Sequence, residues 1–351
     1  MQKRRLSSPA VAIAIAAALA AILFIAALAI GPVTIAVPDV LASVWAQITG
    51  RGEIARQDPA LGSAYNVVAT IRLPRAIIAA LVGAALAVAG TVMQAVFRNP
   101  LADPGIIGVS AGAATAAVLA IVTGFSAVAA WALPASAFLG ALGAVAIVQL
   151  AAAMRGGGPA TLVLVGIALS AFLGAVTAAA IANAPSDSDI RGVAFWLNGD
   201  LAARTWEHVA IASLPIVLGI VLLLFFSRDL NILLMGDQAA RTTGVNVRRV
   251  RVVTLTVAAL ITASAVAVSG VIGFVGLVVP HLIRLIIGPN NKSLLPNAAL
   301  AGAAFLVAAD TIARMLFAPV TLQTGTVVAF IGSPIFLWLL LRGRRPAGWS
   351  A

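Results

Sequence analysis

Asp310 and Arg314 are the residues of this sequence whose types and spacing could most clearly take part in chemistry. The two residues are four positions apart in an otherwise apolar segment, so a helix would bring their side chains together. Ionisable side chains at membrane depth mark proton or ion pathways in secondary transporters. Two interpretations follow, a neutralised structural ion pair or proton coupling through Asp310.

Other reactive groups are scarce. The chain has no cysteine, which excludes disulfides, thiolate metal sites and thiol catalysis. Neither lysine, Lys3 or Lys292, lies in a Gly-x-x-x-x-Gly-Lys-Ser/Thr phosphate loop, and the histidines His208 and His281 are far apart. We therefore expect no enzyme activity, bound cofactor or metal in this chain.

The elements that position these groups must be membrane helices. Of 351 residues, 62% are hydrophobic and only 9% are charged, whereas a soluble domain is about 25% charged. A bilayer-spanning helix needs about 20 predominantly apolar residues. We predict an all-α polytopic membrane protein, with residues 1–351 forming a single transmembrane domain.

Charge-free stretches mark the predicted spans. The stretch 105–154 is long enough for two spans with a break near Thr123 and Gly124, and 252–283 is one long span or two short ones separated near Ser269 and Gly270. The other spans are expected at 11–30, 76–97, 156–186, 208–227, 293–309 and 315–341. We prefer a span at 11–30 over a cleaved signal peptide, whose apolar core is usually about 7–15 residues.

The basic residues fix the predicted topology. Both tails are basic, so the positive-inside bias places both termini in the cytoplasm, with residues 1–8 as a cytoplasmic tail. An even number of spans follows, which favours ten. The net charge of +11 then falls almost entirely on cytoplasmic segments. It indicates topology rather than binding to nucleic acid.

Two long loops are more than connectors. Residues 31–75 form a predicted outer loop that begins with an amphipathic, interfacial helix at 33–48. Residues 228–251 form a predicted cytoplasmic loop, in which Gly236 and Gly244 flank a short helix. We expect Ala239 and Ala240 to be exposed on that helix, as suits insertion into a groove of another protein.

Several motifs occur in order along the chain. They are Arg72-Leu73-Pro74-Arg75, Arg98-Asn99-Pro100-Leu101-Ala102-Asp103-Pro104 and Val279-Pro280-His281, with the segments 82–90, 107–110, 195–201, 236–244, 273–278, 309–314 and 331–340. This set resembles the FecCD-type permeases, the membrane subunits of ATP-binding-cassette (ABC) importers for iron–siderophores, haem and cobalamin. The resemblance runs from about residue 71 to the C-terminus.

The resemblance implies a type II ABC importer permease with ten transmembrane helices in the cytoplasmic (inner) membrane of a bacterium. It implies a homodimer or a pair of paralogous permeases, two cytoplasmic ATPase subunits that hold ATP and Mg, and a substrate-binding protein outside. The ATPase activity would then reside in the partner subunits.

The resemblance also implies three sets of site residues. The loop matching the ATPase-coupling helix contains Gly236, Asp237, Ala239, Ala240, Arg241 and Gly244. Arginines expected to dock the binding protein are Arg72, Arg75 and Arg314. A pathway along helix 161–182 and the loop after it would be lined by Gly166, Ser170, Gly174, Trp196, Leu197 and Asp200.

The cargo is less well defined by the sequence. Segments 196–206 and 228–249 resemble siderophore permeases most, so we predict an iron(III)–siderophore complex, with haem and cobalamin as alternatives. The chain departs from the family pattern at Asp200, where serine is usual, and at 323–326, where Pro-x-Gly-Val is typical. A proton-coupled secondary transporter using Asp310, and a membrane scaffold or receptor without transport, also remain open.

Overall fold

The computed structural model describes residues 9–154, 158–318 and 320–342; the basic tails beyond Arg342 and before Pro9, and Arg155, lie outside the described residues. The described part is helical and contains no strand. Its principal helices are α1 (Pro9–Ala29), α2 (Val37–Ile48), α3 (Gly52–Gln57), α4 (Gly62–Val67), the π-helix η1 (Val68–Arg72), α5 (Leu73–Val96), the 3-10 helix η2 (Pro104–Ile107), α6 (Val109–Val122), α7 (Ala132–Met154), α8 (Pro159–Ala182), α9 (Asp187–Leu197), α10 (Trp206–Phe225), α11 (Ser227–Leu233), α12 (Asp237–Thr242), α13 (Val247–Ser269), α14 (Val275–Ile287), α15 (Asn291–Met315) and α16 (Thr324–Arg342).

The described residues contain seven helices long and apolar enough to cross a membrane, and three shorter apolar helices, α6, α14 and α16. Together these account for the ten predicted spans. Both predicted breaks are confirmed: α6 ends at Val122, next to Thr123, and α13 ends at Ser269. Gly270 follows with φ of 69°, a left-handed conformation that glycine adopts without the strain of a Cβ.

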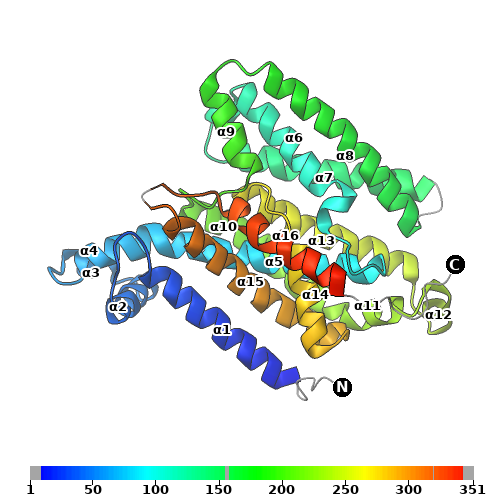
Figure 1. Ribbon diagram of the computed structural model, residues 1–351, viewed down its shortest axis with the longest axis horizontal. Coiled ribbons are helices and arrows are strands. Elements are labelled where there is room, and N and C mark those ends of the chain that lie inside the picture. The colour runs from blue at the N-terminus through cyan, green and yellow to red at the C-terminus, as the bar shows by residue number, and fades with distance from the viewer. Residues whose placement is uncertain (1–8, 155–157, 319, 343–351) are drawn as a thin grey trace.

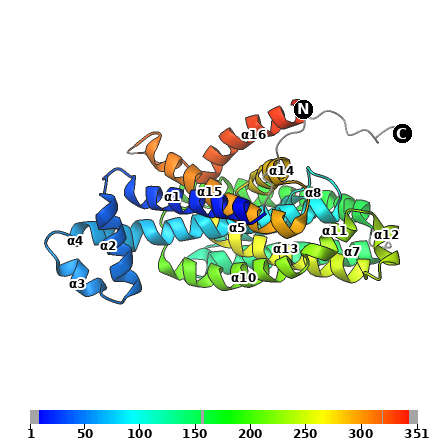
Figure 2. The ribbon, with the colours of Figure 1, turned by 90° about the horizontal axis from the view of Figure 1, so that it is seen from below.

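Helix α5 lies at the centre of the bundle, between α15 and α13 (Figures 1 and 2). A Cβ on Gly83 would overlap the carbonyl of Gly302 in α15, and one on Gly90 would overlap the carbonyl of Gly276 in α14. Because lipid is as apolar as the side chains, such close backbone packing is a main source of helix association in a membrane. These four glycines are therefore packing residues.

The segment 31–75 is more helical than a loop. Helix α2 occupies most of the expected interfacial stretch, and α3 and α4 follow. Figure 2 shows these three helices gathered beyond one end of α1 and α5, the end predicted to face outside. Helix α4 continues through η1 directly into α5, so Arg72 and Arg75 lie on one continuous helical segment.

Helices α6, α7, α8 and α9 form a second layer beside the α5 bundle (Figure 1). Within it, α8 packs against α6, α7 and η2, and it has the smallest buried share of the seven long helices. Its large side chains Leu164, Ile167 and Phe172 are all more than half exposed. The chain therefore leaves an apolar α8 face uncovered.

Candidate functional site

Asp310 is the centre of a buried ion cluster at the end of the molecule that the topology predicts to face outside. Its side chain is 3% exposed, and the Arg75 guanidinium donates to both carboxylate oxygens, from Nε at 2.9 Å and from Nη2 at 2.9 Å. Arg314 Nε lies 3.4 Å from Oδ2, and the Thr324 hydroxyl donates to Oδ1 at 2.8 Å. One carboxylate thus joins α5, α15 and the first residue of α16.

The sequence predicted the Asp310–Arg314 pair but missed the stronger one. Arg75 is 235 residues away from Asp310, and no local spacing connects them. Thr324, which belongs to the departure from the family pattern at 323–326, also proves to be part of the cluster. Two arginines and a hydroxyl occupy the carboxylate, which supports the structural interpretation of the ion pair.

Arg72 and Arg314 hold the C-terminal end of α1. Arg72 donates to the carbonyls of Leu28 and Ala29 at 2.7 and 2.9 Å and also to that of Val33, while Arg314 donates to the carbonyl of Ala27 at 3.0 Å. The last carbonyls of a helix lack partners within the helix and carry partial negative charge, which cations satisfy. These two arginines therefore cap α1.

Docking of a binding protein would need the three outer arginines at the surface. The structure instead has Arg72 and Arg314 buried, at 5% and 8% exposure, and Arg75 bound to Asp310. In this conformation helix ends and a buried carboxylate use their donors. Docking through them stays a prediction, and it requires that they leave these partners.

The inner loop forms the predicted short helix. Helix α12 follows Gly236, which has φ of 106°, and the chain turns at Gly244, which has φ of 83°. The expectation that Ala240 is exposed is wrong: it is fully buried against the bundle, and Ala239 is partly buried. Met235, just before the helix, is 71% exposed and was missed by the sequence reasoning.

Asp237 connects this short helix to the bundle. Its carboxylate accepts from Arg251 Nη2 at 2.9 Å and lies 3.4 Å from Arg98 Nη2. Arg251 belongs to α13, and Arg98 follows the C-terminal end of α5. A force applied to α12 would therefore reach the two most buried long helices of the described structure through one side chain.

The expected pathway residues on α8 differ in their surroundings. A Cβ on Gly166 would overlap the carbonyl of Ile106, so Gly166 packs inside the chain and its assignment to an open pathway does not fit this conformation. Ser170 is partly exposed, and Gly174 has open space around it. Gly273 also has open space around it, so neither Gly174 nor Gly273 packs against another segment of the described chain.

The other expected pathway residues lie near the break between α13 and α14. Trp196 is 6% exposed and its carbonyl accepts from Val271, while the Asp200 amide donates to the Ser269 carbonyl at 2.8 Å. Both residues hold this corner together. Leu197 borders an open cavity of about 530 Å³ that also contacts α16.

Two aromatic residues of that cavity had not been predicted. Phe274 has φ of 65°, which is uncommon for a residue with a Cβ, and Phe330 is 73% exposed. The sequence contained no signal for either, because a backbone conformation and an uncovered face are properties of the assembled chain.

His281 belongs to α14. Its Nδ1 is buried and has no hydrogen-bond partner within the described residues. Among the described residues, no group of three His, Cys, Asp or Glu side chains could hold a metal ion.

Comparison with known proteins decides the family. The model of the FecCD transport family matches residues 19–342. The chain belongs to this family. It is therefore a multi-span permease of the ABC importer class, as the ordered motifs predicted.

Relatives in this family carry different cargo. The chain is 46% identical to the cobalamin import system permease protein BtuC of Halobacterium salinarum, over 79% of this chain and 74% of that one. It is 44% identical to the hemin transport system permease protein HmuU of Yersinia pestis, over 80% of this chain and 84% of that one.

A solved structure described as an inward-facing metal-chelate type ABC transporter has the same architecture. It superimposes with a TM-score of 0.84 and 32% identity, covering 96% of this chain and all of that one. The predicted type II permease architecture is thereby confirmed.

Proposed function

We propose that this chain is one of two permease subunits of an importer in a bacterial cytoplasmic membrane. It would receive a metal chelate from an extracytoplasmic binding protein, and two separate ATPase subunits that hold ATP and Mg would drive the transport. The observation that supports this most is the linkage of the exposed inner helix α12 to α5 and α13 through Asp237.

In this proposal α12 transmits movement of the ATPase subunits to the permease, and we call it the lever. The exposed side chains of Met235 and Arg241 enter a cleft on the ATPase, and closure of the ATPases on ATP moves the helix. Asp237 passes the displacement to Arg98 and Arg251, and so to the core of the bundle. ATP chemistry thus acts on the pathway from a distance.

The uncovered α8 face supports a second permease copy or a paralogue as partner. Leu164, Ile167 and Phe172 are more than half exposed there, beside the open space at Gly174. Contiguous apolar surface facing other helices would be covered on dimerisation, and Ser170 and Gly174 would then line the passage between the two copies.

The test of the lever is transport by the reconstituted complex. Scrambling residues 237–241 should abolish ATP-driven uptake while the permease still accumulates in the membrane, because the ATPase loses its contact. Arg249→Gln, an exposed change on the same loop, is the matched control and should keep uptake. Uptake that persists without any ATPase would contradict the proposal.

For the cargo we propose an iron(III)–siderophore complex, with haem and cobalamin as alternatives. The similarity of segments 196–206 and 228–249 to siderophore permeases supports this, and the relatives named above carry cobalamin or haem. Uptake of labelled ferric siderophore, haem and cobalamin by the same reconstituted complex separates the three. Faster uptake of haem or cobalamin would contradict the siderophore assignment.

The same preparation tests proton coupling through Asp310. Collapsing the proton gradient at constant ATP should leave uptake unchanged, since Arg75, Arg314 and Thr324 already occupy the carboxylate. Uptake that stops with the gradient would favour the secondary-transporter alternative.

A further inference from the structure

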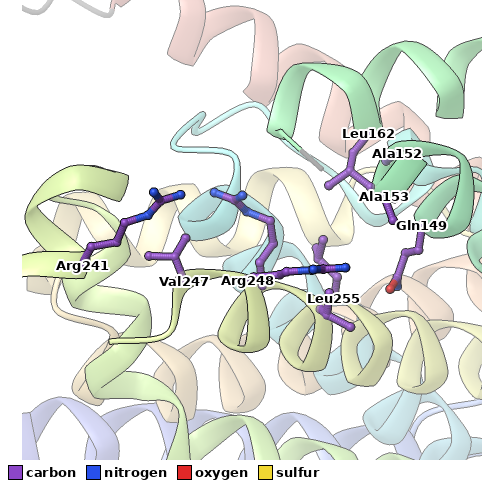
Figure 3. A pocket seen from close by; sticks show the side chains of 10 residues that line it. Gln149, Ala152, Ala153, Leu162, Arg241, Val247, Arg248 and Leu255 are labelled. Carbon is purple, nitrogen blue, oxygen red and sulfur yellow. The ribbon is translucent and has the colours of Figure 1, made fainter. Parts of the chain in front are cut away.

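A cationic cavity lies at the inner end of the helices, beside the lever. It has a volume of about 250 Å³ and is lined by residues of α7, α8, α12 and α13. Figure 3 shows Arg241, Val247 and Arg248 on the α12–α13 side, with Gln149, Ala152, Ala153 and Leu162 on the α7–α8 side. The proposed transport cycle uses Arg241 and Arg251 of this lining, but it assigns no role to Arg248 or to the apolar residues.

The mouth of the cavity is strongly positive. Three guanidiniums line it, those of Arg241, Arg248 and Arg251, and none of the described lining residues is acidic. Arg251 is bound to Asp237, but Arg241 and Arg248 make no ion pair with any described residue. Arginine recognises phosphate well because its planar fork presents several donors at once.

The inner wall of the cavity is apolar. Leu162 is in the first turn of α8, and Val252 and Leu255 are on α13. Leu255 is eight residues beyond Val247, the first residue of α13, which places it about 12 Å into the helix at 1.5 Å per residue. The cavity therefore joins cationic side chains to an apolar wall that follows α13 for about 12 Å.

We propose that this cavity binds the phosphate of an anionic phospholipid from the cytoplasmic leaflet. The guanidinium of Arg248 would contact the phosphate, and the acyl chain would follow Leu162, Val252 and Leu255. Basic pockets between membrane helices on the cytoplasmic side suit such headgroups. An acidic side chain of the ATPase would satisfy the arginines but would leave the apolar wall empty, so the lipid fits better.

The inference rests on the orientation used in the proposed function, with residues 228–251 on the cytoplasmic side, but not on cargo or ATP. The probe is dioleoylphosphatidylglycerol, added to the purified full-length complex and counted on the protein by native mass spectrometry. Dioleoylphosphatidylcholine is the zwitterionic comparison, and inorganic phosphate is the free-anion comparison.

Three variants distinguish lipid binding in the cavity from non-specific attraction of the lipid to basic surface residues. Arg248→Gln should weaken phosphatidylglycerol binding by about tenfold, the loss expected when a hydrogen bond to a charged group is removed. Ala153→Leu keeps every charge but narrows the cavity, and should weaken binding also. Arg249→Gln removes an exposed arginine that does not line the cavity and should leave binding unchanged within about twofold.

Several results would overturn the proposal. Equal losses in Arg248→Gln and Arg249→Gln would mean non-specific attraction, and inorganic phosphate that displaces the lipid completely would mean a free-anion site. Loss of the ATPase subunits from Arg248→Gln with lipid binding intact would identify an ATPase contact instead. Because lipid counting needs neither ATP nor cargo, a failed uptake assay would count against the proposed function alone.

Discussion

Two aspartates at opposite ends of this molecule are each held by two arginines, but in very different surroundings. Asp310 at the outer end is 3% exposed and has Arg75 and Arg314 around it. Asp237 at the inner end is 33% exposed and has Arg98 and Arg251. The same chemistry is thus buried at one end and partly open to water at the other.

The difference in burial implies different roles. Removing one partner of a buried ion pair leaves an uncompensated charge, whereas water replaces a lost partner near the surface. The outer cluster should therefore act as a fixed connection between α5, α15 and α16. The ion pairs of Asp237 can break and reform at a low cost in free energy, as the proposed movement of α12 requires.

The largest expected effect comes from Asp310→Asn. This change keeps the size of the side chain but leaves the Arg75 and Arg314 guanidiniums buried without a counter-charge, which should cost about 3–5 kcal/mol of stability. Thermal unfolding of the detergent-purified protein measures this loss. Adding Arg75→Gln should recover part of it, because the second change removes one of the unpaired charges.

A small loss in Asp310→Asn, similar to that of a surface pair, would remove the distinction between the two clusters. So would a double variant with Arg75→Gln whose loss equals the sum of the single losses, since residues in contact should couple.

Next in size is Arg72→Met at the end of α1. The methionine can fill the space, but the carbonyls of Leu28 and Ala29 lose a buried cationic donor, with an expected cost of about 1–3 kcal/mol. The same unfolding measurement applies. Ile71→Ala, at a neighbouring side chain that is 60% exposed, is the control and should change stability much less. If Arg72→Met proves harmless, the outer arginines are not needed as caps and docking becomes the better account of them.

Asp237→Asn should have a smaller effect on stability. Partly exposed ion pairs contribute about 0–1 kcal/mol, so the unfolding temperature should change little. Added salt should weaken this pair further and leave the Asp310 cluster unaffected, because exposed charges are screened and buried ones much less so. ATP-driven uptake should fall more than stability does, since the link from α12 to α5 and α13 is lost. A stability loss as large as that of Asp310→Asn would contradict the idea that the ion pairs of Asp237 break and reform at low cost.

The sequence predicted the fold well because each span carries its own signal. Apolar length and charge-free stretches gave the ten helices, and Gly270 marked the break before α14. Spacing within one helix also predicted the contact between Asp310 and Arg314.

What the sequence could not predict depends on contacts between distant segments. The bond from Arg75 to Asp310 and the bonds from Arg72 to the end of α1 appear only when the helices assemble, so the sequence pointed to docking alone for these arginines. Burial of Ala240 and of Gly166 follows from the same cause, since an alanine or glycine signals nothing about which neighbour covers it.

Asp103 differs from both Asp310 and Asp237, because it makes no ion pair with any described residue. It lies between α5 and η2, where burial raises its pKa above the ordinary value of 3.8 and the hydrogen bond from the Gly105 amide partly opposes that rise. The folded chain therefore holds this proton more tightly than the unfolded chain does. As the pH rises through 3.8 the unfolded chain ionises first, so stability falls until the pH passes the raised pKa of the folded state.

Asp103→Asn keeps an oxygen that can accept from the Gly105 amide but cannot ionise. The unfolding temperature of this variant should depend less on pH from acidic to neutral conditions than that of the parent protein, with the two most alike at the acidic end. Asp237→Asn is the comparison, because its carboxylate has two arginine partners. If the unfolding temperature of Asp103→Asn depends on pH as strongly as that of the parent protein, burial of Asp103 without a cation does not distinguish it from the paired aspartates.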